Sequence, residues 1–369
     1  MKYSVFYSNE PKEYKAIAEI YSNIPHDSVN TVLLFISENY DLKMISAGIK
    51  KVFEGMQIFA CTSKTLIYNN SFKSDGIVAI GFYKEDVNSE IIYIRDINDF
   101  SNNKAELFSL NFKTKNSDFF KYPSSYIGII FYNNLLNNEI SLQLSQFFNP
   151  INIMGVIPSS SNLTPLFFNG ECFSEKSAVL LILKCKTQII PYNLANVLPT
   201  EQPLVVTFCN ESERVVYELN SEKAANVISK LIGCNITDID ENKLNNNPLL
   251  IRYKNKIAPI VIKRINEIDL SIEFFIKVTL GTVLRLGIND DICGSTQKHL
   301  IELEKTLGNF KFNLIFDSTY RYLNAKQNNI LKSYSESFNN FNCYGCTTQT
   351  EYLQGINHNS TLSGVAFLE

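Results

Sequence analysis

The chain of 369 residues contains no tryptophan, only three histidines and no cluster of charge of either sign. Lys and Arg number 34 against 37 Asp and Glu, so the formal net charge is −3. A protein that binds nucleic acid usually carries a basic face, and these scattered cations predict none. Hydrophobic residues make up 45% of the chain, which is ample for folded cores and argues against disorder.

Long apolar runs are also absent. The longest, such as residues 178–183, have the length of a strand and not the roughly 20 residues of a membrane-spanning helix. The first ten residues, MKYSVFYSNE, lack the cationic and apolar pattern of a secretory signal. We therefore expect a cytoplasmic protein without membrane insertion. Its eight unevenly spaced cysteines are then expected to be reduced and mostly buried.

A unit of strand, helix, strand, loop and strand recurs along the chain. In the first copy, Asp41 would cap the helix and Gly55 would follow its end. The strands of the three copies are predicted at 31–36, 57–62 and 77–83, at 126–132, 151–157 and 177–183, and at 312–316, 341–345 and 361–368. The helices are predicted at 42–53, 140–147 and 324–338.

The second strand of each copy runs into small polar residues, and two of these ends resemble each other: 60–65 (ACTSKT) and 345–350 (GCTTQT). The third such end is at 158–161 (PSSS). We interpret all three as turns. Ser and Thr are good turn residues, but the carboxyl ends of strands are also where α/β sheets hold ligands.

These patterns predict an α/β protein whose repeated units form mixed sheets flanked by helices, in two domains. We place the boundary near Ser212, which gives domains of 1–212 and 213–369. A weaker fourth copy would start at Val215, with a helix stopped by Gly233. The polar segment 240–247 is expected to be a surface loop.

Several segments resemble the FIST family, in order along nearly the whole chain. Residues 167–171 (FFNGE), followed by 177–183, resemble the end of the FIST N-terminal domain. Residues 215–220 (VVYELN) resemble the start of the FIST C-terminal domain. Residues 343–345 (CYG) and 358–362 (HNSTL) resemble that family's closing signature. Cys346 departs from it, because the family commonly has Glu there. Asp317-Ser318 replaces a common Ser-Cys, while Arg321 is retained.

The resemblance implies a sensory module that binds a small ligand, which could be like an amino acid. The domain stands alone here, so it would signal through a separate partner such as a histidine kinase or a cyclic-dinucleotide enzyme. Some members of the family bind haem and report nitric oxide. A non-covalent haem b, held by His358, is therefore an alternative for this chain.

The candidate ligand site lies in the C-terminal half. Gly345 would offer backbone donors without side-chain bulk, and Arg321 a fixed positive charge suited to a carboxylate. His358, in the loop before the last strand, would close the site, unless its ring only fixes that loop. The candidate ligand-binding residues are Arg321, Tyr344, Gly345, Cys346, Thr347 and His358.

Two chemical alternatives remain open at this stage. The spacing Cys343-x-x-Cys346 occurs in redox and zinc sites. We expect no metal site, since the sequence has no second Cys or His pair at metal spacing, and interpret the pair as structural. An enzyme that uses Cys346 or His358 is the other alternative, although no nucleotide-binding or hydrolase motif supports one.

Overall fold

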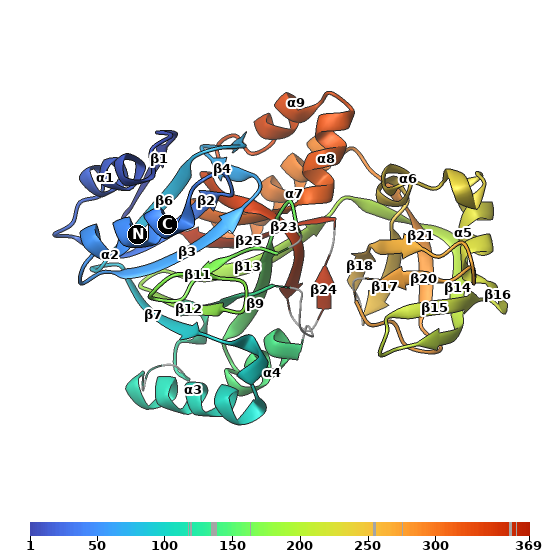
Figure 1. Ribbon diagram of the computed structural model, residues 1–369, viewed down its shortest axis with the longest axis horizontal. Helices are drawn as coiled ribbons and strands as arrows, with labels where there is room; N and C mark the ends of the chain where they lie inside the picture. Colours follow the sequence, from blue (N-terminus) through green and yellow to red (C-terminus); the bar gives the residue numbers. More distant parts are fainter. Residues whose placement is uncertain are drawn as a thin grey trace.

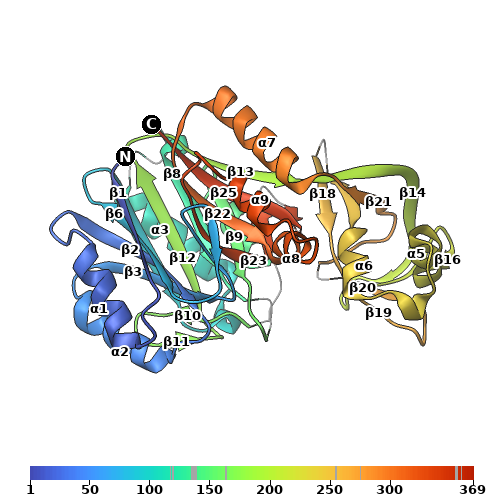
Figure 2. The ribbon, with the colours of Figure 1, turned by 90° about the horizontal axis from the view of Figure 1, so that it is seen from above.

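The computed structural model describes residues 1–369 apart from 117, 119, 134–138, 163, 254–255, 275, 354–355 and 359. A large body and a smaller lobe make up the molecule (Figures 1 and 2). Residues 197–289 form the lobe, and the residues on either side of them in the sequence form the body. The two termini lie side by side at the end of the body away from the lobe (Figures 1 and 2).

The first unit of the body has four strands in the order β1-β6-β2-β3. β2 is parallel to β3, with a helical crossover between them, and β6 is antiparallel to both β1 and β2. Its main elements are β1 (Tyr3–Ser8), α1 (Glu13–Asn23), β2 (Val29–Ser37), α2 (Leu42–Val52), β3 (Gln57–Ser63) and β6 (Ile77–Tyr83).

The same order and directions return twice, as β7-β12-β8-β9 and as β13-β25-β22-β23. The predicted repeat is therefore confirmed, with one more strand per unit than predicted. The second unit contains β7 (Val87–Ile94), α3 (Asn102–Lys115), β8 (Tyr126–Phe131), α4 (Glu139–Phe147), β9 (Asn152–Pro158) and β12 (Ala178–Cys185). The third contains β13 (Ile189–Ala195), α7 (Ile292–Leu307), β22 (Phe310–Ser318), α8 (Thr319–Gln327), α9 (Leu331–Glu336), β23 (Cys343–Leu353) and β25 (Thr361–Leu368).

Local signals in the sequence account for the crossover helices. At the start of α2 the Asp41 carboxylate accepts a hydrogen bond of 2.8 Å from the amide of Lys43, which satisfies one of the free N–H groups of the first turn. Ile45 and Ile49 lie one turn apart and are buried against the sheet. The chain then turns at Gly55, whose φ of 81° lies in the left-handed region that favours glycine.

Three phenylalanines form the centre of the body's core. Phe35, Phe131 and Phe316 occupy matching positions in β2, β8 and β22. Each lies opposite a residue of the parallel strand β3, β9 or β23, namely Cys61, Val156 and Cys346. All six side chains are fully buried in one cluster. The Phe316 ring lies 6.4 Å from the Phe35 ring and 5.6 Å from the Phe131 ring. The repeats therefore pack around a shared core and not around three separate ones.

A closed ring of backbone hydrogen bonds joins the residues just after β3, the residue just after β9 and Thr347 within β23. Lys64 N–H donates to the carbonyl of Ser159 (3.0 Å), and Ser159 N–H donates to that of Thr347 (2.8 Å). Thr347 N–H completes the ring by donating to Thr65 (2.9 Å). Inside it, the Ser159 hydroxyl lies 3.0 Å from that of Ser63 and 2.6 Å from that of Thr347.

The lobe is a sheet in the order β18-β17-β21-β14-β15-β20-β19, and its strand pairs are antiparallel throughout the described residues. β14 runs from the body into the lobe (Figure 2). The elements are β14 (Val197–Asn210), β15 (Val215–Leu219), β16 (Glu222–Lys223), α5 (Ala224–Ile232), α6 (Glu241–Asn246), β17 (Leu249–Tyr253), β18 (Lys256–Ile260), β19 (Ile262–Ile265), β20 (Ile272–Phe274) and β21 (Val283–Asn289).

The predicted fourth copy is wrong, because β15 pairs antiparallel with β14 and β20, and the described residues give it no parallel partner across α5. The predicted end of α5 is confirmed, with Gly233 in the left-handed conformation. The expected boundary at Ser212 falls in the hairpin between β14 and β15, two strands of one sheet. β23, which follows the lobe in the sequence, pairs with β9 of the N-terminal half. We therefore propose a division into a body and an inserted lobe.

Three further expectations need correction. The helix predicted at 324–338 begins at Thr319 and is interrupted near Asn329, which has a φ of 58°. The segment 240–247 contains α6, with Asp240 as its N-cap. Residues 346–350 are not a turn, because β23 continues to Leu353 through antiparallel pairing with β9. Sequence patterns within one unit cannot show pairing between units.

The shared core gives a direct test. Replacement of Phe316 by Ala should lower the free energy of unfolding by about 3–5 kcal/mol, because it leaves a cavity where the units meet. Replacement of Leu198, which is 58% exposed, by Ala should change it by less than about 0.5 kcal/mol. Urea unfolding of the two variants measures both values. A loss below about 1 kcal/mol for Phe316→Ala would contradict the shared core.

Candidate functional site

A cavity of about 720 Å³ lies where the body meets the lobe. Its body wall is made by the strand ends that form the backbone ring and by the first turn of α8. Its lobe wall is made by β19 and by the chain around α6. The residues that line it are Lys64, Ser159, Ser160, Ser161, Ile236, Ile239, Leu244, Ile262, Lys263, Arg264, Ile265, Glu267, Thr319, Tyr320, Leu323 and Gln349.

The body wall is mostly polar. Ser159 and Ser160 are buried at the end of β9, and the amide of Ser161 donates to both carboxylate oxygens of Glu38 at 3.1 Å. The hydroxyl oxygen of Thr319, at the start of α8, is buried and accepts or donates no hydrogen bond within the described structure. An unpaired buried hydroxyl is costly unless a ligand or water satisfies it. The Thr319 hydroxyl of this wall is therefore available for a hydrogen bond to a ligand or to water.

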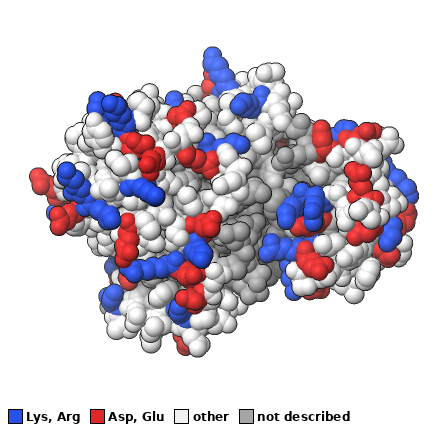
Figure 3. All heavy atoms as spheres, viewed as in Figure 1, with Lys and Arg blue, Asp and Glu red and all other residues white. Residues whose placement is uncertain are grey.

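The lobe wall combines apolar and charged side chains. Lys263 and Arg264 both reach Glu273, at 2.6 Å and 2.5 Å. Burial alone would raise the pKa of Glu273, but the hydrogen bonds from these two cations lower it below its ordinary value. The carboxylate therefore stays ionised and holds both cations at the cavity. On the face shown in Figure 3, Lys and Arg atoms gather on the side of the lobe that faces the body.

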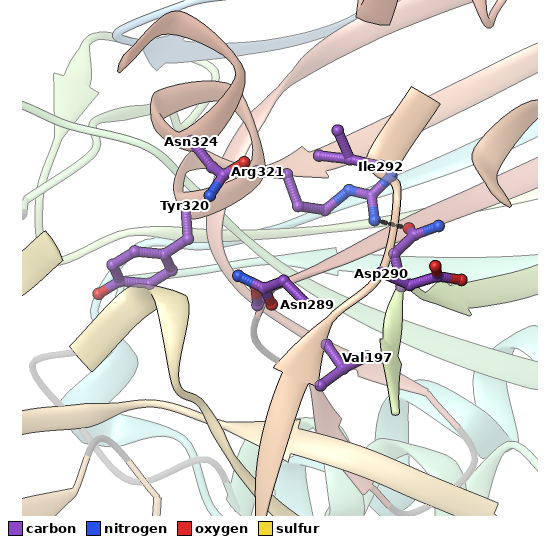
Figure 4. Close-up of a pocket in the computed structure, with 9 residues that line it drawn as sticks. Val197, Asn289, Asp290, Ile292, Tyr320, Arg321 and Asn324 are labelled. Atoms are coloured by element: carbon purple, nitrogen blue, oxygen red, sulfur yellow. Dashed lines mark hydrogen bonds between the residues drawn. The ribbon is translucent and has the colours of Figure 1, made fainter. Parts of the chain in front are cut away.

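A second, much smaller cavity of about 20 Å³ lies beside Arg321 (Figure 4). The Arg321 side chain is buried, and its Nε donates to Asp317 (2.9 Å) and to the Tyr334 hydroxyl (3.0 Å). Its two other nitrogens donate to Asn196 and to Thr296 (2.7 Å for the latter). A cavity of this volume holds about one water molecule and not a small organic ligand.

Arg321 joins the two places where the chain passes between body and lobe. Asn196 immediately precedes β14, and Asp290 immediately follows β21. The amide of Asp290 donates to the carbonyl of Asn196 (3.0 Å), so the two crossings are bonded to each other. The dashed line in Figure 4 marks the bond from Arg321 to Asn196. The guanidinium thus joins these two crossings, here called the hinge, to α8.

Two carboxyl groups are buried near Arg321. Burial raises the pKa of Asp317 to about 6, although Arg321 and Tyr334 oppose this rise. Burial raises the pKa of Glu351 to about 8 against hydrogen bonds from Thr348 and Thr361, and the nearby charge of Asp317 adds to the rise. Glu351 is therefore mostly protonated at neutral pH. No sequence motif singled it out, because its register on β23 beside Thr361 depends on pairing between distant strands.

The structure does not bring all the predicted site residues together. Tyr344 belongs to an aromatic group, with its ring 5.7 Å from that of Phe312. Gly345 has a φ of 151° and packs so closely on Ile315 that a Cβ would lie 1.9 Å from its carbonyl oxygen. Thr347 lies in the hydroxyl cluster of the backbone ring. The close backbone packing is therefore the reason for glycine at position 345.

The two cysteines of the Cys343-x-x-Cys346 motif are free and lie in different hydrophobic cores on opposite faces of β23. Cys346 is fully buried beside Cys61, whose pKa burial raises well above its ordinary value. The backbone of His358 forms part of β24 (Ile356–His358), which pairs with β23. Its side chain lies outside the described residues.

Sequence reasoning missed most of the residues that line the larger cavity. Of the predicted ligand-binding strand ends, Ser159 and Ser160 do line it. Lys263, Arg264 and Glu267 come from a charged segment of the lobe without a recognisable motif. Lys64 and Gln349 occupy equivalent places in the two similar hexapeptides, and this was the one signal that could have indicated them.

The profile of a protein family described as the FIST N domain matches residues 30–222, more than half of the chain. No curated protein matches the chain. Among solved structures, a chorismatase is 7% identical with a TM-score of 0.37, over 99% of this chain and 98% of that one. T. maritima PurL complexed with AMPPCP is 10% identical with a TM-score of 0.20, over 99% of this chain and 72% of that one. Structural likeness this low establishes neither fold nor activity.

Among the described residues, no helix has the length and apolar character that a membrane crossing requires.

The raised pKa of Glu351 predicts how stability depends on pH. An acid whose pKa is higher in the folded state contributes stability that is fully present below its unfolded pKa, near 4.5, and is lost as pH rises to about 8. The wild-type protein should therefore lose up to about 1.4 kcal/mol per pH unit from this group between pH 5 and 8. Urea unfolding across this range measures the slope. The Glu351→Gln protein should show a smaller slope, and an unchanged slope would contradict the assignment.

Proposed function

Because the chain belongs to the FIST family, whose domains are sensory modules of signal transduction, we propose that it senses a small ligand bound between the body and the lobe. The carrying observation is the cavity of about 720 Å³ lined by both parts. Pockets of roughly 300–1,000 Å³ hold small molecules and cofactors in other proteins. A ligand there would contact elements that lie far apart in the sequence and that folding brings together.

The proposed signal is a change in the position of the lobe. The first turn of α8 places Thr319 and Tyr320 against the ligand cavity and Arg321 against the hinge. A ligand that binds one lobe position more tightly shifts the equilibrium toward it. The hinge then responds through the same helix turn, because Tyr320 lines both cavities. This geometry supports a sensor whose ligand and moving part share one element.

We also propose that a separate cytoplasmic signalling protein detects the lobe position, and that this partner is a histidine kinase or a cyclic-dinucleotide enzyme. The ligand class suggested by family resemblance is an amino acid or a related molecule. A direct ligand contact stays a prediction for the residues named from the sequence: Arg321, Tyr344, Gly345, Cys346, Thr347 and His358. The cavity next to Arg321 supports a part in the hinge more than contact with the ligand.

A cavity-blocking variant tests this function. The probes are the free amino acids, straight-chain monocarboxylates and haem, each assayed by thermal unfolding. A probe at 100 times its Kd stabilises the protein by about 2.7 kcal/mol, which raises Tm by roughly 3–4 °C for a chain of this length. Ser161→Trp places a large ring at the exposed edge of the cavity and should abolish that rise.

Ser22→Trp is the matched control, since Ser22 is exposed at the end of α1 in the body. It should retain the full rise in Tm. An equal rise in the Ser161→Trp protein would show that the probe binds elsewhere. Absence of stabilisation by every probe would contradict a ligand-sensing function of this cavity.

A further inference from the structure

The lining of the large cavity is divided into a cationic part and an apolar part. Lys64 reaches it from the body, and Lys263 and Arg264 reach it from β19 of the lobe. Among the lining residues that the structure describes, Glu267 is the one carboxylate beside these three cations. Behind the lining, Glu273 pairs with Lys263 and Arg264. Glu38 accepts from the amide of Ser161, whereas Lys64 forms no ion pair with a carboxylate among the described residues. The surface of the cavity itself is therefore cationic.

The apolar part is wide. Six aliphatic side chains line it, five from the lobe and one from α8: Ile236, Ile239, Leu244, Ile262, Ile265 and Leu323. Burial of a ligand's hydrocarbon against them is favourable by about 0.8 kcal/mol per methylene group. A free amino acid of ordinary size fills only part of about 720 Å³. Volume and lining together favour a ligand with a longer hydrocarbon chain.

We propose that the ligand is an aliphatic monocarboxylate of medium or long chain, with its carboxylate between Lys64 and Arg264 and its chain against the aliphatic wall. This proposal rests on the proposed sensory function and names the class of ligand. A carboxylate is complementary to a lining in which three cations accompany one carboxylate. The unpaired hydroxyl of Thr319 can donate a hydrogen bond to the same carboxylate.

The carboxylate also explains how binding is transmitted. Lys64 follows β3 in the body, whereas Arg264 belongs to the lobe, so a carboxylate that both cations contact links the two parts. An amine of the same chain length would bring a further positive charge to this cationic lining, and an alcohol would bring no negative charge to it. The ligand class therefore follows from charge as well as from volume.

Calorimetric titration of the full chain with hexanoate, octanoate, decanoate and dodecanoate, each below its micelle concentration, tests the proposal. Affinity should rise about fourfold per methylene group until the cavity is filled. Decanol should bind at least tenfold more weakly than decanoate, and decylamine more weakly still. Equal affinity for decanol and decanoate would overturn the proposal.

Two pairs of variants locate the site. Lys64→Gln and Arg264→Gln should each weaken decanoate binding about tenfold or more, through loss of a charge-assisted hydrogen bond. The controls are Lys50→Gln on the exposed side of α2 and Arg252→Gln, which lies beside a different cavity of the same lobe. Both controls should bind decanoate as the wild type does. Weakening by Arg252→Gln alone would place the ligand at that other cavity and overturn the proposal.

The outcomes also separate this proposal from the sensory function itself. Suppose that leucine binds, that Lys64→Gln abolishes its binding, and that decanoate does not bind. That result would support the sensory function and reject the aliphatic monocarboxylate as its ligand. Failure of every probe to bind would reject both. Far-UV circular dichroism and Tm of each variant confirm that a loss of binding is not a loss of fold.

Discussion

The structure of this sensory domain depends on the closed ring of backbone hydrogen bonds among Lys64, Thr65, Ser159 and Thr347. Each of the three repeated units contributes to this ring, from just after β3, just after β9 and within β23, and each bond joins two different units. Buried backbone groups are stable only when paired. The ring therefore fixes the units against one another at one end of the shared core, whose centre is the contact of Phe35 and Phe131 with Phe316.

The same ring shapes the polar wall of the large cavity. Strand ends in α/β folds usually face solvent and offer free backbone groups. Here the backbone groups of Ser159 and Thr347 are used in holding the units together, so side chains at the rim take over the polar contacts. The lobe completes the site because its insertion after β13 places β19 opposite the rim. The cavity thus belongs to the junction and to neither part alone.

Much of the body could be predicted from the sequence, since each unit carries its own signals. Asp41 as a helix cap and the apolar run 31–36 are local features, and the structure confirms both. The antiparallel pairing of β9 with β23 is not local, because nearly 200 residues separate their strands in the chain. The same limit explains the wrong fourth copy. The strand and helix that start at Val215 resemble those of the repeated unit, and only the antiparallel pairing of β15 with β14 and β20 shows that they belong to a different sheet.

The prediction of the site shows a related limit, and Arg321 is the clearest example. Asp317 and Arg321, near a strand end, suggest either a ligand contact or an ion pair. What the sequence lacks is the position of Asn196, which lies 125 residues earlier and accepts a hydrogen bond from the guanidinium. Removing Arg321 would leave Asp317 buried without its cation, and a buried charge without a partner is strongly destabilising. Arg321 therefore bonds to the chain crossing at Asn196, while Lys263 and Arg264, which line the larger cavity, lie in a segment without a motif.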